Sequence, residues 1–143
     1  MKKYMIIIML TICFSEYSVS QTINEYVKAN DIENVRKLVE NDHELINFRD
    51  NIGRTPLHWS ARGVHTEIMR FLIDKGADLN AKDNNGICPI VSVVARNHNE
   101  AVKLLLDSGA STLITDNEGT YPIHISAQYG FVDIVKMLYE KDT

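Results

Sequence analysis

Residues Asp50–His58 read DNIGRTPLH, and this stretch decides the fold because it returns twice downstream. The same frame recurs as DNNGICPIV in Asp83–Val91 and as DNEGTYPIH in Asp116–His124. The aspartate, glycine and proline of the frame each recur at an interval of 33 residues. A fixed interval of this size is typical of proteins built from stacked repeats, so the sequence predicts a repeat protein.

Each copy of the frame predicts a tight turn followed by two helices. Gly53 supplies the positive φ that a tight turn needs. Thr55 can cap the helix that follows, a short segment expected over Pro56–Arg62, because proline suits the first helical position. A second helix, with apolar residues at helical spacing, is expected over Thr66–Asp74. Gly76 is expected to end that helix as a C-terminal cap.

The repeated unit resembles the ankyrin-repeat family, whose unit is a β-turn plus two antiparallel helices of about 33 residues. Thr55–His58 matches the family's Thr-Pro-Leu-His signature, and Gly76–Ala81 matches its repeat ending. The resemblance implies an all-α fold, an α-solenoid of stacked helix-turn-helix units joined by β-turn or hairpin loops. A single helix pair buries too little apolar area to be stable alone. The implied repeats span approximately residues 21–49, 50–82, 83–115 and 116–143, the first being a polar capping repeat.

The signature varies between repeats. The resemblance implies that His58 bonds the signature threonine and nearby backbone, tying the turn of a repeat to its helix. The next repeat has Cys88 and Val91 at the two signature positions, so the hydroxyl and the imidazole are lost together. The last repeat keeps His124 but places Tyr121 where the threonine should be. The imidazole of His124 is therefore expected to find another acceptor.

The first twenty residues read as a secretory signal peptide. Lys2 and Lys3 precede a short apolar run, and Ser18–Ser20 offers small residues where signal peptidase cuts. The run is too short for a membrane span, which needs about 20 helical residues, so no stable transmembrane segment is expected. We therefore expect a signal peptide at 1–20, a domain at 21–143, and an exported protein, periplasmic or secreted. The short leader suggests a bacterial source, with a eukaryotic secretory context as the alternative. A lipid tether through Cys13 is the alternative, because residues 10–13 resemble a lipobox.

Nothing in the sequence predicts catalysis, a cofactor or a metal site. The net charge of −4 argues against a nucleic-acid partner, which would need a basic face. His58 and His124 share one repeat position but have no nucleophile or paired carboxylate at a fixed spacing. His65 and His98 would lie on neighbouring helices, too far apart to share a metal. Cys88 is interpreted as a small, half-buried hydrophobic residue.

The surface remains as the candidate functional region. In the family, partners are usually held by the turn tips and by the concave face of the inner helices. Trp59 lies on that helix, and we expect it to belong to the core rather than to a partner contact. We predict a monomer that binds another protein; the alternatives are an accessory subunit of an enzyme, an envelope scaffold tethered through Cys13, or a merely solvated face. The predicted contact residues are Arg54, Arg62, Lys82, Asn84, Asn85, Arg96, Asn117, Glu118, Gln128 and Tyr129.

Overall fold

The computed structural model describes residues 23–142, so the predicted signal peptide, its cleavage after Ser20 and the alternative tether at Cys13 lie outside the described residues. Residues 23–28 are helical. The elements that follow are α2 (Ile32–Asn41), the 3-10 turn η1 (His43–Asn47), α3 (Pro56–Gly63), α4 (Thr66–Asp74), α5 (Pro89–Val94), α6 (Asn99–Asp107), α7 (Pro122–Gln128) and α8 (Val132–Asp142). The described part of the chain contains no strand, which confirms the all-α prediction.

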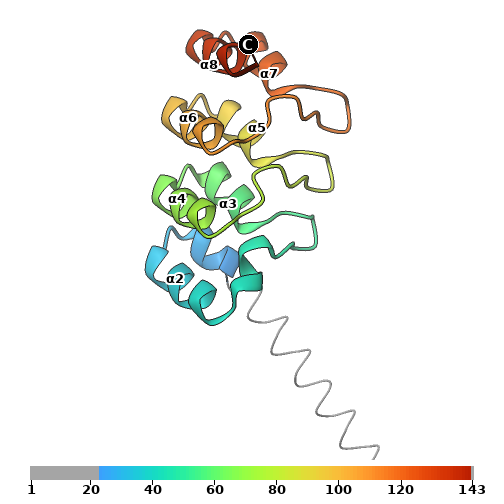
Figure 1. Cartoon of the computed structure of the whole chain (residues 1–143). Coiled ribbons are helices and arrows are strands. Elements are labelled where there is room, and N and C mark those ends of the chain that lie inside the picture. The colour runs from blue at the N-terminus through green and yellow to red at the C-terminus, as the bar shows by residue number, and fades with distance from the viewer. Residues whose placement is uncertain (1–22, 143) are drawn as a thin grey trace, which may run out of the picture.

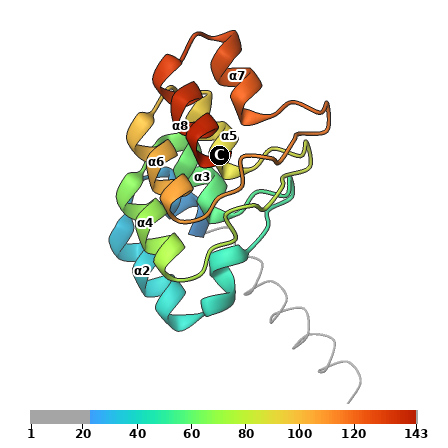
Figure 2. The same ribbon diagram turned by 45° about the horizontal axis from the view of Figure 1, so that its top comes forward.

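The helices form a stack of antiparallel pairs (Figure 1). Within a repeat, α3 packs on α4, α5 on α6 and α7 on α8. Between repeats, the inner helices α3, α5 and α7 contact one another in sequence order, and the outer helices pair as α2 with α4 and α6 with α8. The long loops project together from one side of the stack (Figure 2). We call the turns and the exposed residues of the inner helices the inner face.

The core lies between the inner and outer helices and is shared by neighbouring repeats. Leu57 and Ala61 of α3 and Ile68 and Leu72 of α4 are fully buried. Their counterparts in the next repeat, Ile90, Val94, Ala101 and Leu105, are also fully buried. In the last repeat the inner-helix counterparts Ile123 and Ala127 are partly or fully exposed, because no described element packs over them. Burial of an inner helix therefore depends on the repeat that follows it.

Local signals set the helix boundaries as the sequence predicted. The helix expected over Thr66–Asp74 has those bounds, and the helix that begins at Pro56 runs one residue further than predicted, to Gly63. Gly76 has a φ of +93°, and its N–H donates to the carbonyl of Ile73. A left-handed glycine that satisfies a terminal carbonyl is the expected helix cap. No helix among the described residues is long and apolar enough to cross a membrane.

The signature histidine links two repeats. Nδ1 of His58 lies 3.1 Å from the backbone nitrogen of Thr55 and 2.9 Å from its hydroxyl oxygen, as the resemblance implied. Because Nδ1 accepts the Thr55 N–H, the proton lies on Nε2, which donates to the Ile87 carbonyl at 3.0 Å. Ile87 belongs to the turn of the following repeat. The imidazole therefore ties its own helix start to the next turn as well, a contact that the sequence did not predict.

The residues at the signature positions of the later repeats make different contacts. Cys88 is fully buried, so the expectation of a half-buried residue is wrong, and this burial raises the pKa of its thiol. His124 is exposed, and its Nδ1 accepts the Tyr121 N–H over 3.4 Å while the two rings meet edge to face. The expectation that His124 finds another acceptor is corrected, because in this contact its Nδ1 is itself the acceptor and the ring is exposed to solvent.

Restoring the signature in the third repeat should reveal coupling between its two residues. We expect Cys88→Thr alone to gain little, because it buries a hydroxyl without its partner. In Val91→His the imidazole would stand at the repeat position of His58, with Thr120 as the counterpart of Ile87. The combined change should exceed the sum of the single changes by about 0.5 kcal/mol or more. Chemical denaturation of the four proteins measures this free energy of unfolding. Additivity within about 0.3 kcal/mol would contradict the linked role of the two groups.

The His58 contact also predicts a pH dependence of stability. Burial lowers the pKa of His58, outweighing the backbone hydrogen bond to Ile87 that favours the charged form. The unfolded chain therefore binds this proton more readily, and the contribution of His58 is complete above the ordinary pKa of about 6.5 and is lost as the pH falls below it. Urea denaturation between about pH 7.5 and 5 should show this loss. His58→Gln should flatten the profile, whereas the control His124→Gln should keep it; equal profiles in all three proteins would overturn the assignment.

Candidate protein-binding surface

The turns of the inner face are built around an aspartate. One carboxylate oxygen of Asp50 accepts the N–H groups of Ile52 and Arg54, at 3.1 and 2.9 Å. Asp83 and Asp116 make the same two bonds in their own turns. These carboxylates therefore hold the turn conformation, which explains why aspartate returns at every interval of the repeat.

Neighbouring turns are also bonded to one another. The backbone N–H of Asn84 donates to the Ile52 carbonyl at 3.0 Å, and that of Asn117 donates to the Asn85 carbonyl at 3.1 Å. The side-chain amides repeat the pattern one position earlier, from Asn84 to the Asn51 carbonyl and from Asn117 to the Asn84 carbonyl. The tips of the turns are therefore a hydrogen-bonded ladder along the stack.

The ladder explains why glycine is required in the turns. Gly53 has a φ of +78°, and a Cβ built on it would lie 2.5 Å from the side-chain oxygen of Asn84. Gly86 has the same φ and would meet Asn117 at the same distance. Both the left-handed backbone and the close approach of the next turn exclude a side chain at these positions.

Two of the predicted contact residues that carry positive charge form links between repeats. Arg54 Nε lies 3.0 Å from Asp83 Oδ2, and the side chains are only 17% and 1% exposed. Burial opposes ionisation of Asp83, but hydrogen bonds from Arg54 and from backbone N–H groups outweigh it and lower the pKa of that carboxyl. Lys82 Nζ donates to the carbonyl of Thr115 at 2.6 Å. Arg54, Lys82 and Asn84 therefore all have bonding partners in a neighbouring repeat that the sequence did not reveal.

The ten predicted residues thus divide into two groups. The side chains of Arg54, Lys82, Asn84 and Asn117 bond to a neighbouring repeat, although Lys82, Asn84 and Asn117 are themselves exposed. The other six are exposed: Arg62, Asn85, Arg96, Glu118, Gln128 and Tyr129. Among these six, Arg62 and Arg96 line the same pocket. Contact with a partner stays a prediction for all ten residues.

Trp59 occupies the boundary between core and surface. Its indole Nε1–H donates to the second carboxylate oxygen of Asp50 at 2.8 Å, and one edge packs on the core. Lys28 Nζ lies 4.0 Å from the ring centroid, and the guanidinium carbon of Arg54 lies 5.1 Å from it. The expectation of a core residue is therefore only half right, because Trp59 also lines a surface pocket.

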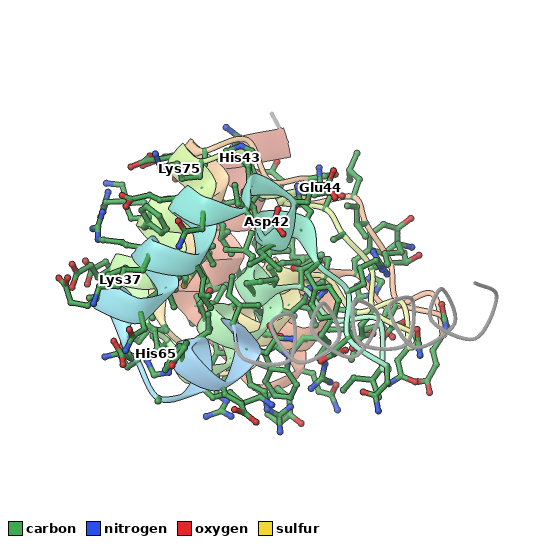
Figure 3. All side chains as sticks on the ribbon, turned by 90° about the horizontal axis from the view of Figure 1, so that it is seen from below. Lys37, Asp42, His43, Glu44, His65 and Lys75 are labelled. Carbon is green, nitrogen blue, oxygen red and sulfur yellow. The ribbon has the colours of Figure 1, made fainter. Side chains whose placement is uncertain are left out.

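That pocket has a volume of about 280 Å³ and is predominantly basic. It is lined by Lys28, Trp59, Arg62, Gly63, His65 and Arg96. The residues come from three repeats, and Figure 3 shows His65 on the side of the stack away from the turn loops. Sequence reasoning missed Lys28 because the first repeat has no turn to align. The sequence pattern that could have identified Lys28 is its place at the end of the helical segment 23–28. Arg62 lies near the end of the next inner helix in the same way.

Among residues 23–142, no group of three or more His, Cys, Asp or Glu side chains is placed to hold a metal ion. Further along the inner face, Tyr129 stacks on Phe131 with ring centroids 5.7 Å apart. Exposed aromatic and arginine side chains are the types that dominate protein-binding energetics.

These features define a solenoid repeat protein whose exposed inner face carries basic and aromatic side chains. The family model described as ankyrin repeats (3 copies) matches residues 23–83 and 80–143, so the chain belongs to the ankyrin-repeat family. Ankyrin repeats are non-catalytic interaction modules.

Curated proteins of several kinds are similar to part of this chain. The chain is 39% identical over 64 residues to acyl-CoA-binding domain-containing protein 6 homolog of Dictyostelium discoideum. This match covers 45% of this chain and 22% of that protein. It is 34% identical over 61 residues to palmitoyltransferase akr1 of Emericella nidulans, covering 43% and 8%. It is 42% identical over 52 residues to serine/threonine-protein kinase VIK of Arabidopsis thaliana, covering 36% and 12%. The matched segment spans less than a quarter of each relative.

The difference between the ion-paired Arg54 and the exposed Arg62 predicts mutational effects of different size. Arg54→Ala should destabilise the chain by about 2 kcal/mol, because it leaves the buried carboxylate of Asp83 without its charged partner. Arg62→Ala should change stability by less than about 0.5 kcal/mol, as expected for an exposed side chain. Thermal and chemical denaturation of both variants make the comparison. Equal stability of the two would refute the structural role assigned to Arg54.

Proposed function

We propose that this chain is a non-catalytic module that binds another protein through the inner face. The observation that carries the proposal is the pair Arg62 and Arg96, exposed beside the half-buried Trp59 and without a carboxylate partner among residues 23–142. Arginine and tryptophan are enriched among residues that dominate binding energy. Family membership supports the same reading, because stacked repeats create extended binding surfaces.

The candidate catalytic groups support a non-enzymatic function. His58 is buried, and both of its ring nitrogens are engaged with Thr55 and Ile87. Cys88 is buried, and burial raises the pKa of its thiol, which disfavours the nucleophilic thiolate. A turnover that disappears in His58→Gln or His124→Gln, with folding intact, would overturn this part of the proposal.

A role as an accessory part of an enzyme is the second candidate. Its support is that two relatives are named palmitoyltransferase and kinase, while their similarity to this chain covers 61 and 52 residues. The repeats in such a role would hold an enzyme or its substrate rather than perform chemistry. Identification of the captured partner separates the two candidates, because the second requires that partner to be an enzyme or an enzyme's substrate.

We also propose export of the chain, supported by the charge, apolar run and small residues within 1–20. The relatives named above come from eukaryotes, so they give no support to a bacterial source. Intact mass of the exported protein tests the proposal. A start at Gln21 supports cleavage after Ser20, a lipid mass on Cys13 supports the tether, and a retained leader contradicts both.

Reversing the charges of the pocket should abolish binding without unfolding the chain. Immobilised protein is used to capture a partner from an extract, and the purified partner is then titrated against variants. We expect the double variant Arg62→Asp and Arg96→Asp to lose binding at least about tenfold, because like charges across an interface disfavour association. Helical circular dichroism and the melting temperature should be unchanged. Undiminished binding by this variant would reject the assignment of the site.

A further inference from the structure

The pocket beside Trp59 concentrates positive charge on a chain whose net charge is −4. Lys28, Arg62 and Arg96 converge on it from three successive repeats, and His65 completes its edge. No carboxylate lines the pocket. Asp50, which contacts Trp59, has its oxygens already bonded to turn N–H groups and to the indole.

These cations differ from the other charged side chains of the structure. Arg54 is paired with Asp83, and Arg36 lies 3.8 Å from Glu67. Within residues 23–142, none of Arg62, Arg96 and Lys28 has an ion pair, and the ammonium of Lys28 lies over the ring of Trp59. Clustered like charges repel one another, so a bound anion would relieve that repulsion. A guanidinium also presents a planar fork that matches a carboxylate.

We propose that this pocket binds an acidic segment of the partner protein, with two carboxylates about three residues apart. The proposal rests on the protein-binding function proposed above and adds the chemistry of the partner. Neighbouring packed helices lie about 8–10 Å apart, which sets the scale between Arg62 on α3 and Arg96 after α5. An extended polyproline II segment repeats its side-chain direction every three residues, over about 9 Å. Two glutamates at that spacing therefore fit both arginines.

The chain carries its own reporter for this site, because Trp59 is its only tryptophan. Lys28 lies over the ring, so a carboxylate that draws this ammonium away must change the surroundings of the indole. The test is a titration of the whole chain with a short synthetic peptide in which two glutamates flank two prolines. Tryptophan fluorescence and the NMR signal of the indole N–H are followed together. The control peptide carries glutamine in place of both glutamates.

We expect saturable binding of the glutamate peptide, weakened severalfold by raising salt from about 50 to 200 mM because the interaction is charged. The glutamine peptide should produce no saturable change. The double variant Arg62→Gln and Arg96→Gln should bind at least about tenfold more weakly, with unchanged melting. The matched control, Lys103→Gln and Lys136→Gln, removes the same charge from exposed positions on α6 and α8 and should bind within about twofold of the unmodified chain.

Four outcomes would overturn the proposal. They are equal binding of both peptides, equal weakening in both double variants, absence of saturable binding, and an identical indole response to inorganic phosphate at the same ionic strength. The last would indicate a simple anion site rather than a peptide site. Failure here is distinguishable from failure of the proposed function, because the captured partner is titrated separately. Suppose that the captured partner no longer binds the double variant Arg62→Asp and Arg96→Asp, while the acidic peptides do not bind the unmodified chain. The proposed binding function would then stand, and only the acidic chemistry of the partner segment would be rejected.

Discussion

Each helix pair of this chain must share its apolar side with the next repeat, and the rest of the structure depends on that constraint. Leu57 and Ile90 on consecutive inner helices are fully buried because another repeat follows each of them. Ile123, at the same position in the last repeat, is only partly buried. Stability is therefore distributed along the stack, and a change in one repeat is felt by its neighbours.

Hydrogen bonds also join each repeat to the next one along the stack. His58 reaches the Ile87 carbonyl, and the backbone of Asn84 bonds the turn before it. Both contacts join groups that lie about one repeat apart, so they hold the relative position of successive turns and inner helices. A surface made from several repeats needs that fixed position. The pocket that contains Lys28, Arg62 and Arg96 exists only because three repeats are stacked in register.

The cations of the inner face illustrate how one residue type serves two purposes. Arg54 is committed to a buried carboxylate, whereas Arg62 lies exposed at the end of the same inner helix. The first contributes to folding through an interaction that excludes water. The second leaves its guanidinium available to a partner, at little cost to stability. Such a division allows the surface charge to be altered while the repeat geometry remains.

The sequence by itself determined the repeat, its turns and its helix boundaries, because these depend on local chemistry. The positive φ at Gly53, the proline at position 56 and the cap at Gly76 each act on backbone within a few residues of their own position. The sequence also named Arg62 and Arg96, because the family resemblance implies that partners are held by the turn tips and the inner helices. The turn glycine and the proline recur at a fixed interval and need no knowledge of the stack to be recognised.

Only the tertiary structure decided which of the predicted contact residues are bonded within the chain and which stay exposed. Arg54 and Asp83 are 29 residues apart, and Lys82 reaches a carbonyl 33 residues away. Whether such groups meet depends on the rotation between repeats and on side-chain reach, which no local pattern records. The same holds for Lys28, which joins the pocket across a repeat boundary, and for Trp59, which that neighbour partly covers. Distances between repeats are a property of the packed stack, because burial of the shared core sets them.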